Sequence, residues 1–170
     1  LVYEQRHRQY LLVKAPPACG KSRAMMFVAL DKLENQGIKK VIVAVPEKTI
    51  GRSFDNTNLK DFGFFADWRV ADYFKLCGGN ETEKKKRFFE FIDKGCKNKI
   101  LVCTHSTLRN AVKELSDEQL NDCLFGIDEY HHSSADANNG LGELIRRLIA
   151  NTNAHILAMT GSYFRGDKIP

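Results

Sequence analysis

Residues 15–22, Ala-Pro-Pro-Ala-Cys-Gly-Lys-Ser, constrain the fold of this chain more than any other segment. They have the form of a phosphate loop, Ala/Gly-x-x-x-x-Gly-Lys-Ser, with alanine at the first position, where glycine is usual. An apolar run at 10–13 precedes the loop, and a helical pattern from about 22 to 36 follows it. Backbone N–H groups at the positive end of a helix bind phosphates, so such a loop must lie between a strand and a helix. The segment therefore predicts a strand, a phosphate-binding turn and a helix in succession.

Three residues of the loop have a predicted chemical role. Gly20 allows close approach to the phosphates, and Ser22 offers a hydroxyl ligand to Mg²⁺. Lys21 brings positive charge to the β and γ phosphates and is predicted to be catalytic. The predicted nucleotide-binding residues are Ala15, Pro16, Pro17, Ala18, Cys19, Gly20, Lys21 and Ser22.

Apolar runs alternate with helical patterns along the whole chain. Residues 41–45 form a continuous β-branched run stopped by Pro46, which is typical of a strand covered on both faces. We predict further strands at 10–13 (short and buried), 69–76, 100–103, 124–127 and 154–159, and helices at 82–94, 106–115, from 116, and at 141–149. Strands joined by helical crossovers indicate an α/β fold, a parallel β-sheet flanked by helices on both faces.

Composition limits the class of protein. A chain of 170 residues is long enough for one well-buried domain, and 43% hydrophobic with 28% charged residues is typical of a folded globular protein. No apolar run approaches the roughly 20 residues of a membrane helix, so we expect no membrane partner. Five scattered cysteines without a Cys-x-x-Cys pair indicate reduced thiols and a cytoplasmic location. A net charge of +5 is compatible with a nucleic-acid partner.

An Asp-Glu-Tyr-His motif begins directly after the apolar run 124–127. Asp128 is the predicted partner of Ser22 in holding Mg²⁺, a metal that prefers octahedral oxygen ligation. Glu129 is predicted to be catalytic, as the general base that polarises the attacking water. A phosphate loop followed by this acidic pair predicts a nucleoside triphosphatase.

Two segments have more than one interpretation. The acidic pair could be a solvated turn, or could form a metal site with His131 and His132. The basic run 84–87 could bind nucleic acid, but the acidic residues around it favour a solvated helix face.

These motifs together resemble the first RecA-like domain of a superfamily 2 DEAD/DEAH-box helicase, in the restriction-enzyme-like (ResIII) branch. The motif at 128–131 is similar to the DExH box, and Thr160-Gly161-Ser162 is similar to motif III. The run 162–167 is similar to Thr-Pro-Phe-Arg-x-Asp, with tyrosine in place of proline. Residues 45–48 and 103–108 stand where motifs Ia and Ib would lie.

The resemblance implies a role for further residues. His131, Thr160 and Ser162 would couple the nucleotide state to movement of a second domain. The residues expected near a nucleic-acid backbone are Pro46, Lys48, Arg52 and Thr104. For Pro46, Lys48 and Thr104 the alternative roles are a strand-end breaker, a solvated lysine and a helix cap. Gln5 and Gln9 are the upstream candidates for the adenine-reading glutamine, although neither has the usual spacing.

The resemblance also implies what lies outside this chain. Residues 1–170 would be the helicase ATP-binding domain of a longer protein, and a second RecA-like domain would supply the arginine finger. We therefore expect ATP and Mg²⁺ as cofactors, nucleic acid (DNA rather than RNA) as partner, and little or no hydrolysis by the isolated chain. The expected function is the motor domain of a helicase or translocase. The alternatives are the motor of a restriction-type nuclease complex, or a non-hydrolysing nucleic-acid-binding domain.

Overall fold

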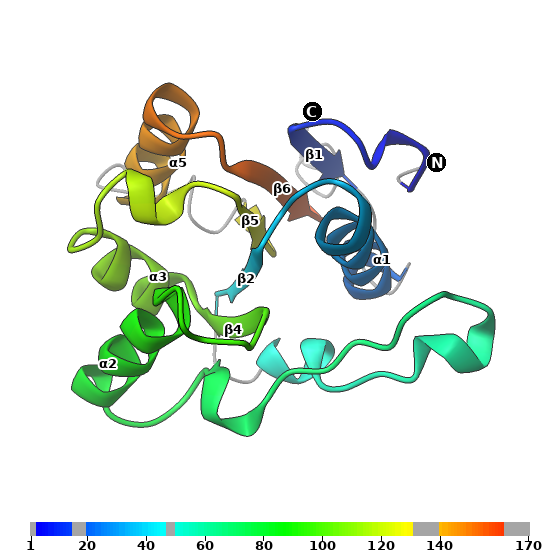
Figure 1. Ribbon diagram of the computed structural model, residues 1–170, viewed down its shortest axis with the longest axis horizontal. Coiled ribbons are helices and arrows are strands. Elements are labelled where there is room, and N and C mark those ends of the chain that lie inside the picture. The colour runs from blue at the N-terminus through cyan, green and yellow to red at the C-terminus, as the bar shows by residue number, and fades with distance from the viewer. Residues whose placement is uncertain (1–2, 15–19, 47–49, 131–139, 162–170) are drawn as a thin grey trace, which may run out of the picture.

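The fold of this chain is seen in a computed structural model, which describes residues 3–14, 20–46, 50–130 and 140–161. The described residues form a six-stranded sheet in the order β1-β6-β5-β2-β4-β3, and every strand pair is parallel (Figure 1). The strands are β1 Tyr10–Lys14, β2 Lys40–Val45, β3 Lys75–Leu76, β4 Ile100–Thr104, β5 Cys123–Ile127 and β6 His155–Thr160. The α-helices are α1 Lys21–Asn35, α2 Glu81–Ile92, α3 His105–Val112 and α5 Gly140–Asn151. The predicted α/β class is confirmed.

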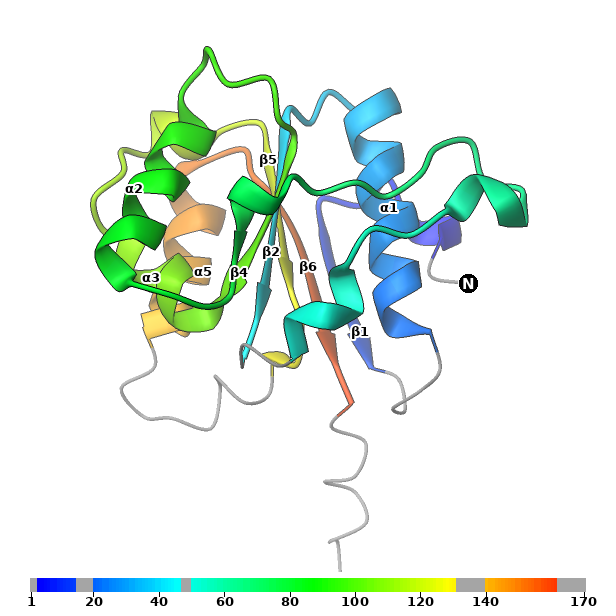
Figure 2. The ribbon, with the colours of Figure 1, turned by 90° about the horizontal axis from the view of Figure 1, so that it is seen from below.

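Helices cover both faces of this sheet, with α1 on one side and α2, α3 and α5 on the other (Figure 2). Alternate residues of β2 belong to two separate hydrophobic clusters. Val43 shares one cluster with Met25 of α1, whereas Ile42 shares the other with Leu108 of α3. Because both faces are buried, residues 41–45 of β2 include no polar side chain, and this explains the continuous apolar run.

Helix α1 lies unusually close to the sheet at one point. A Cβ atom built on Gly126 of β5 would lie 2.6 Å from the sulfur of Met25. Met25 is fully buried, so a larger residue at 126 would displace it from a packed core. The missing side chain at 126 therefore lets α1 pack directly over β5, and this packing sets where the helix begins relative to the end of that strand.

Strand β1 is not the buried strand that its apolar run predicts. Among the described residues it pairs only with β6, at the edge of the sheet. Tyr10 is 41% exposed and Leu12 is 58% exposed. An apolar run shows that a strand is present, but its place in the sheet depends on pairings that are distant in the sequence.

The largest departure from the predicted elements is residues 50–74, which we call the arm. In place of a strand over 69–76, only Lys75–Leu76 pairs with β4. The arm contains three short 3-10 helices, η2 Ile50–Phe54, η3 Leu59–Phe62 and η4 Asp72–Phe74. It extends along the outer side of α1 (Figures 1 and 2). The indole of Trp68, fully buried, donates to the carbonyl of Phe54 at 2.9 Å, which closes the arm on itself.

Local signals around the other helices agree with the structure. Ser116 and Gln119 form a reciprocal capping box at the start of η5 Glu118–Leu120, with hydrogen bonds of 2.9 and 3.3 Å. In the basic run of α2, Arg87 pairs with Glu83 on the same helix. Lys84 differs from a solvated lysine, because it is buried and pairs with Glu81 at 2.6 Å.

A buried polar group ties α1 to the start of β6. The ammonium of Lys32 donates to Nδ1 of His155 at 2.7 Å and to the carbonyl of Arg8 at 2.9 Å. An ammonium has no acceptor, so this ring nitrogen of His155 must be unprotonated. Burial, and then the charge of Lys32, lowers the pKa of His155 from 6.5 to about 4. Burial also lowers the pKa of Lys32 from 10.5 to about 8.

The stability of the fold is therefore expected to depend on pH through His155. Its folded pKa lies below its unfolded pKa, so between about 6.5 and about 4 the unfolded chain binds a proton that the folded chain does not. The free energy of unfolding should fall as pH is lowered through this range. Urea unfolding at pH 7 and at pH 5 measures the change. His155→Asn keeps an acceptor near Nδ1 without a titrating ring, and it should reduce the difference between the two pH values; an unchanged difference would contradict this assignment.

Candidate functional site

The carboxyl ends of three neighbouring strands bring the predicted site residues to one edge of the sheet. Lys14, the last residue of β1, is in register with Thr160, the last residue of β6. Ile127, the last residue of β5, is in register with Ala158. The phosphate-loop segment and the acidic pair therefore follow the ends of β1 and β5, and the buried Thr160 ends β6, the strand between them.

The two residues predicted to be catalytic are in contact. Nζ of Lys21 lies 3.2 Å from Oε2 of Glu129, although the two residues are 108 positions apart in the sequence. Their side chains are only 11% and 25% exposed. Gly20 precedes Lys21 as the N-cap of α1, with a φ of 84°, a left-handed conformation that glycine adopts without steric cost. The start of α1 and the end of β5 thus form one site.

The backbone of Asp128 is held from two sides. Its N–H donates to the carbonyl of Ala44 in β2 at 2.8 Å. Its carbonyl accepts from Nε2 of His105 at 2.9 Å, and His105 is buried at the start of α3. This histidine is not among the site residues predicted from the sequence. Its position in the sequence could have indicated a role, because His105 directly follows β4, whose carboxyl end lies at the same edge of the sheet as the acidic pair.

Glu129 has a strained backbone, with a φ of 51°. This left-handed conformation is uncommon for a residue with a side chain, and it persists only where the surroundings enforce it. Glu129 turns the chain away from the end of β5, and its carboxylate contacts Lys21 at the same point. Strain at a residue of this kind is common in functional sites.

The oxygen donors at this edge fit Mg²⁺. Ser22 is the second residue of α1, beside Lys21, and Asp128 is buried next to Glu129. A hydroxyl and a carboxylate are the hard oxygen ligands that this metal selects. No cluster of three or more His, Cys, Asp or Glu side chains that could hold a metal occurs within 3–14, 20–46, 50–130 and 140–161. Ala15–Cys19, Lys48, His131, His132 and Ser162 lie outside the described residues.

The predicted nucleic-acid contacts that are described lie around β2 and β4. Thr104 ends β4, is buried, and caps α3 by accepting from the N–H of Thr107 at 3.3 Å. Pro46 follows β2, and Arg52 is exposed in η2 of the arm. A pocket of about 280 Å³ lies between these strand ends and is lined by Pro46, Thr104, Ser106, the ion pair of Lys84 and Glu81, and the run 77–79.

The two glutamines proposed to read adenine make other contacts. The amide of Gln9 donates to the carbonyl of Ala154 at 3.1 Å, at the amino-terminal ends of β1 and β6. That is the opposite edge of the sheet from Lys21. The side chain of Gln5 accepts from the guanidinium of Arg8. The structure therefore gives no support to the adenine-reading role of Gln9.

The sheet is parallel, and a phosphate-loop glycine and lysine lie at its carboxyl edge, facing an acidic residue. This arrangement defines a P-loop domain of RecA-like architecture. Residues 2–165 match the family model described as "Type III restriction enzyme, res subunit". The chain belongs to this family, and the predicted resemblance to the first RecA-like domain of a superfamily 2 helicase is confirmed.

Individual relatives agree with this assignment. The chain is 56% identical over 168 residues to "Putative ATP-dependent helicase YeeB" of Bacillus subtilis (strain 168), covering 99% of this chain but 28% of that protein. The Pyrococcus furiosus Hef helicase domain superposes with a TM-score of 0.64 at 20% identity, over 95% of this chain and 31% of that one. The UvsW helicase from bacteriophage T4 superposes with a TM-score of 0.58 at 21% identity, over 97% of this chain and 51% of that one. At these identities the structures show a shared fold.

None of the helices built by the described residues combines the length and the apolar composition needed to cross a bilayer.

The capping contact of Thr104 leads to a stability prediction. Thr104→Ala removes the acceptor for the N–H of Thr107, and loss of such a cap costs about 1 kcal/mol. The free energy of unfolding, measured with urea, should fall by about this amount. Thr104→Ser keeps the hydroxyl and serves as the control, with stability close to that of the parent. Equal stability of the alanine variant and the parent would show that the cap does not contribute.

Proposed function

We propose that this chain is the ATP-binding motor domain of a helicase or translocase, which couples ATP hydrolysis to movement on nucleic acid. The observation that carries the proposal is the 3.2 Å contact between Lys21 and Glu129 at the start of α1. It joins a phosphate-binding lysine to a base candidate at the edge where strand ends meet. The name of the Bacillus subtilis relative, an ATP-dependent helicase, supports the same activity. The chain spans only 28% of that relative, so the activity of a complete protein is part of the proposal.

The Lys21–Glu129 pair supports a sequence of events at this site. A triphosphate between the start of α1 and Glu129 would attract the ammonium of Lys21 more strongly than one carboxylate does, because it carries more negative charge. Lys21 would then move its contact from Glu129 to the β and γ phosphates. Glu129 would become available to orient and polarise the attacking water.

The oxygen atoms of Ser22 and Asp128 would hold Mg²⁺ in this proposal, and the ion would neutralise charge on the phosphates. The hydrogen bond from His105 would keep the backbone of Asp128 in place while its carboxylate acts as a ligand. Loop residues Ala15–Cys19 would complete the phosphate cradle, and Thr160, with His131 and Ser162, would transmit the nucleotide state. His105 is thus a positioning residue.

Nucleic acid would pass over the ends of β2 and β4. The pocket between Pro46, Thr104 and Ser106 has room for a backbone phosphate, and Lys84 lies at its wall together with its ion-pair partner Glu81. Lys48 and Arg52 would add positive charge nearby. Contacts to phosphate carry little sequence preference. We propose DNA rather than RNA as the partner, and a cytoplasmic location, in which free thiols such as Cys103 and Cys123 stay reduced.

Turnover would need a second RecA-like domain outside residues 1–170. An arginine finger supplies about 10³-fold or more in phosphoryl transfer, and we assign it to that second domain. The isolated chain should therefore hydrolyse ATP little. Comparable turnover by the isolated chain and by a two-domain protein would contradict this part of the proposal.

Nucleic-acid-stimulated ATPase activity of the full-length protein tests the two central residues. Glu129→Gln should retain ATP binding and lose turnover by about 10²-fold or more, because general-base catalysis is removed. Lys21→Ala should lose ATP binding as well as turnover. Steady-state hydrolysis and equilibrium binding of ATP with Mg²⁺ are the measurements.

Matched controls come from the same chain. Glu34, exposed on α1, and Lys39, whose side chain is 77% exposed, lie away from the candidate site. Glu34→Gln and Lys39→Ala should leave turnover unchanged. Undiminished hydrolysis in Lys21→Ala or Glu129→Gln would refute the motor assignment, and absence of ATP binding by the parent protein would favour the non-hydrolysing alternative.

A further inference from the structure

His105 connects two parts of the molecule that have separate roles in the proposed function. It is the first residue of α3, and its neighbours in the chain, Thr104 and Ser106, both line the pocket between the ends of β2 and β4. The buried side chain of His105 is directed to the acidic pair instead, with Nε2 2.9 Å from the carbonyl oxygen of Asp128. Three consecutive residues therefore contact both the pocket and the acidic pair.

The carbonyl that His105 holds belongs to the peptide group between Asp128 and Glu129. A carbonyl oxygen can only accept, so Nε2 of His105 carries the hydrogen of this bond. Rotation of this peptide group changes the φ of Glu129, which is 51° in the structure. Such a left-handed conformation persists only where the surroundings enforce it, and the hydrogen bond from His105 is a contact that does so.

This peptide group has two discrete arrangements. In the one observed, it accepts from His105 and the carboxylate of Glu129 lies 3.2 Å from Lys21. Rotation of the group would break the hydrogen bond, let the φ of Glu129 return to the favoured negative range and redirect the carboxylate. The cost of a left-handed residue and the net gain from one buried hydrogen bond are similar in size, so this single contact can decide which arrangement dominates.

The start of α3, which carries His105, is suited to respond to an anion in the pocket. The hydroxyl oxygens of Thr104 and Ser106 lie 3.3 Å apart at the amino-terminal end of this helix, where the helix dipole favours negative charge. The charge of Glu81 at the pocket is balanced by Lys84, 2.6 Å away. A backbone phosphate that accepts from these hydroxyls would order the first turn of α3.

We propose that His105 is a relay residue, through which nucleic acid in this pocket positions Glu129 for hydrolysis. The proposal rests on the proposed function, since it takes Glu129 as the general base and the pocket as a phosphate contact. Nucleic acid orders the start of α3 and so raises the fraction of molecules in which His105 holds the peptide before Glu129. His105 touches neither ligand, and it acts as a positioning residue for the base.

Stimulation of ATP hydrolysis by nucleic acid, in the full-length protein, tests the relay. The measured quantity is the ratio of kcat with a saturating single-stranded DNA oligonucleotide to kcat without it. His105→Leu fills the buried space without a donor. It should lower this ratio by about tenfold, or to unity where the parent is stimulated less than that, because a misplaced general base loses much of its contribution.

Two further variants separate the hydrogen bond from the ring. His105→Gln keeps an N–H close to the position of Nε2, and its ratio should stay close to that of the parent. His105→Asn has a shorter side chain whose amide does not reach Asp128, so it should lose stimulation as His105→Leu does. This variant keeps the test valid where His105→Leu does not fold.

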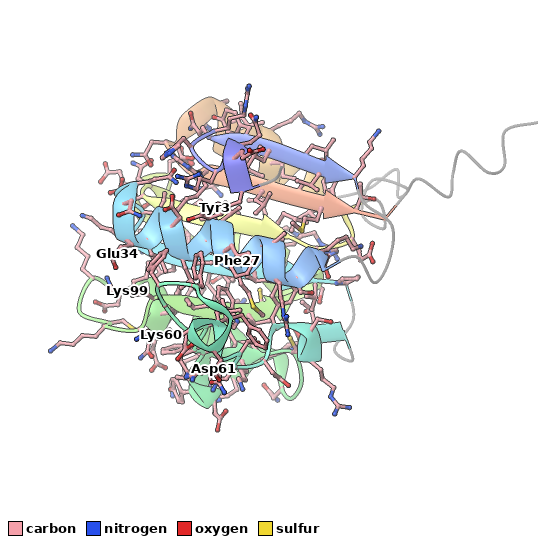
Figure 3. The ribbon with its side chains drawn as sticks, turned by 90° about the vertical axis from the view of Figure 1, so that its right-hand side faces the viewer. Tyr3, Phe27, Glu34, Lys60, Asp61 and Lys99 are labelled. Carbon is pink, nitrogen blue, oxygen red and sulfur yellow. The ribbon has the colours of Figure 1, made fainter. Side chains whose placement is uncertain are left out.

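Arg147→Ala and Lys99→Ala provide matched controls. Arg147 of α5 donates to the carbonyls of Leu115 and Val112 at 2.6 and 3.0 Å, so its loss loosens the carboxyl-terminal end of α3, away from His105. Lys99 is exposed and precedes β4, and Figure 3 shows it at the end of the sheet opposite the arrowheads of the strands. Both variants should leave the ratio unchanged.

Every other outcome contradicts the relay. An equal fall of kcat with and without nucleic acid in His105→Leu keeps the ratio, and would show that His105 only supports the fold. Equal losses in His105→Gln and His105→Leu would show that the ring and not the donor is needed. Loss of stimulation in Arg147→Ala would show that any loosening of α3 has this effect.

Failure of the relay and failure of the proposed function give different results. A parent protein that hydrolyses ATP equally fast with and without the oligonucleotide would overturn the relay alone. A parent protein that does not hydrolyse ATP under either condition would refute the motor assignment, and the relay with it.

Discussion

Burial of both faces of a parallel sheet is the constraint on which the rest of this structure depends. Apart from Lys40 at the start of β2, the residues of the central strands β2, β4 and β5 are all buried, so positions within these strands have no room for functional polar groups. Such groups can occur only where the strands end. Parallel strands end at the same edge, and residues 108 positions apart in sequence, Lys21 and Glu129, therefore come into contact there.

Charged side chains have different roles at the two edges of the sheet. At the amino-terminal edge, Lys32 and His155 form a contact that joins α1, β6 and the segment before β1. At the carboxyl edge, the Lys21–Glu129 pair is partly exposed and includes a residue with a strained backbone. Charges that hold a fold together are satisfied by the protein itself, whereas the pair at the carboxyl edge has the exposure needed to exchange its contact for a ligand.

The candidate site was largely predictable because its residues belong to short local patterns. The phosphate loop and the acidic pair each combine a strand end with a specific dipeptide, and parallel strands end at the same edge of a sheet. Gly126 and His105 were not predictable in this way. One is needed because α1 packs close to β5, and the other because α3 begins beside Asp128, so both depend on contacts between elements distant in the sequence.

By itself, the sequence determined the parallel α/β class, the order of its main strands and helices, and the segments that form the site. Apolar periodicity and loop chemistry are local properties, and they can be read along the chain. Only the tertiary structure decided that β1 lies at a sheet edge, that residues 69–74 are not a strand, and that the arm places Phe62 over Arg23. These outcomes depend on which distant residues satisfy the hydrogen bonds of each segment and bury its side chains. The hydrogen bond from the indole of Trp68 to the carbonyl of Phe54 is one example. No local pattern in the sequence encodes such pairings.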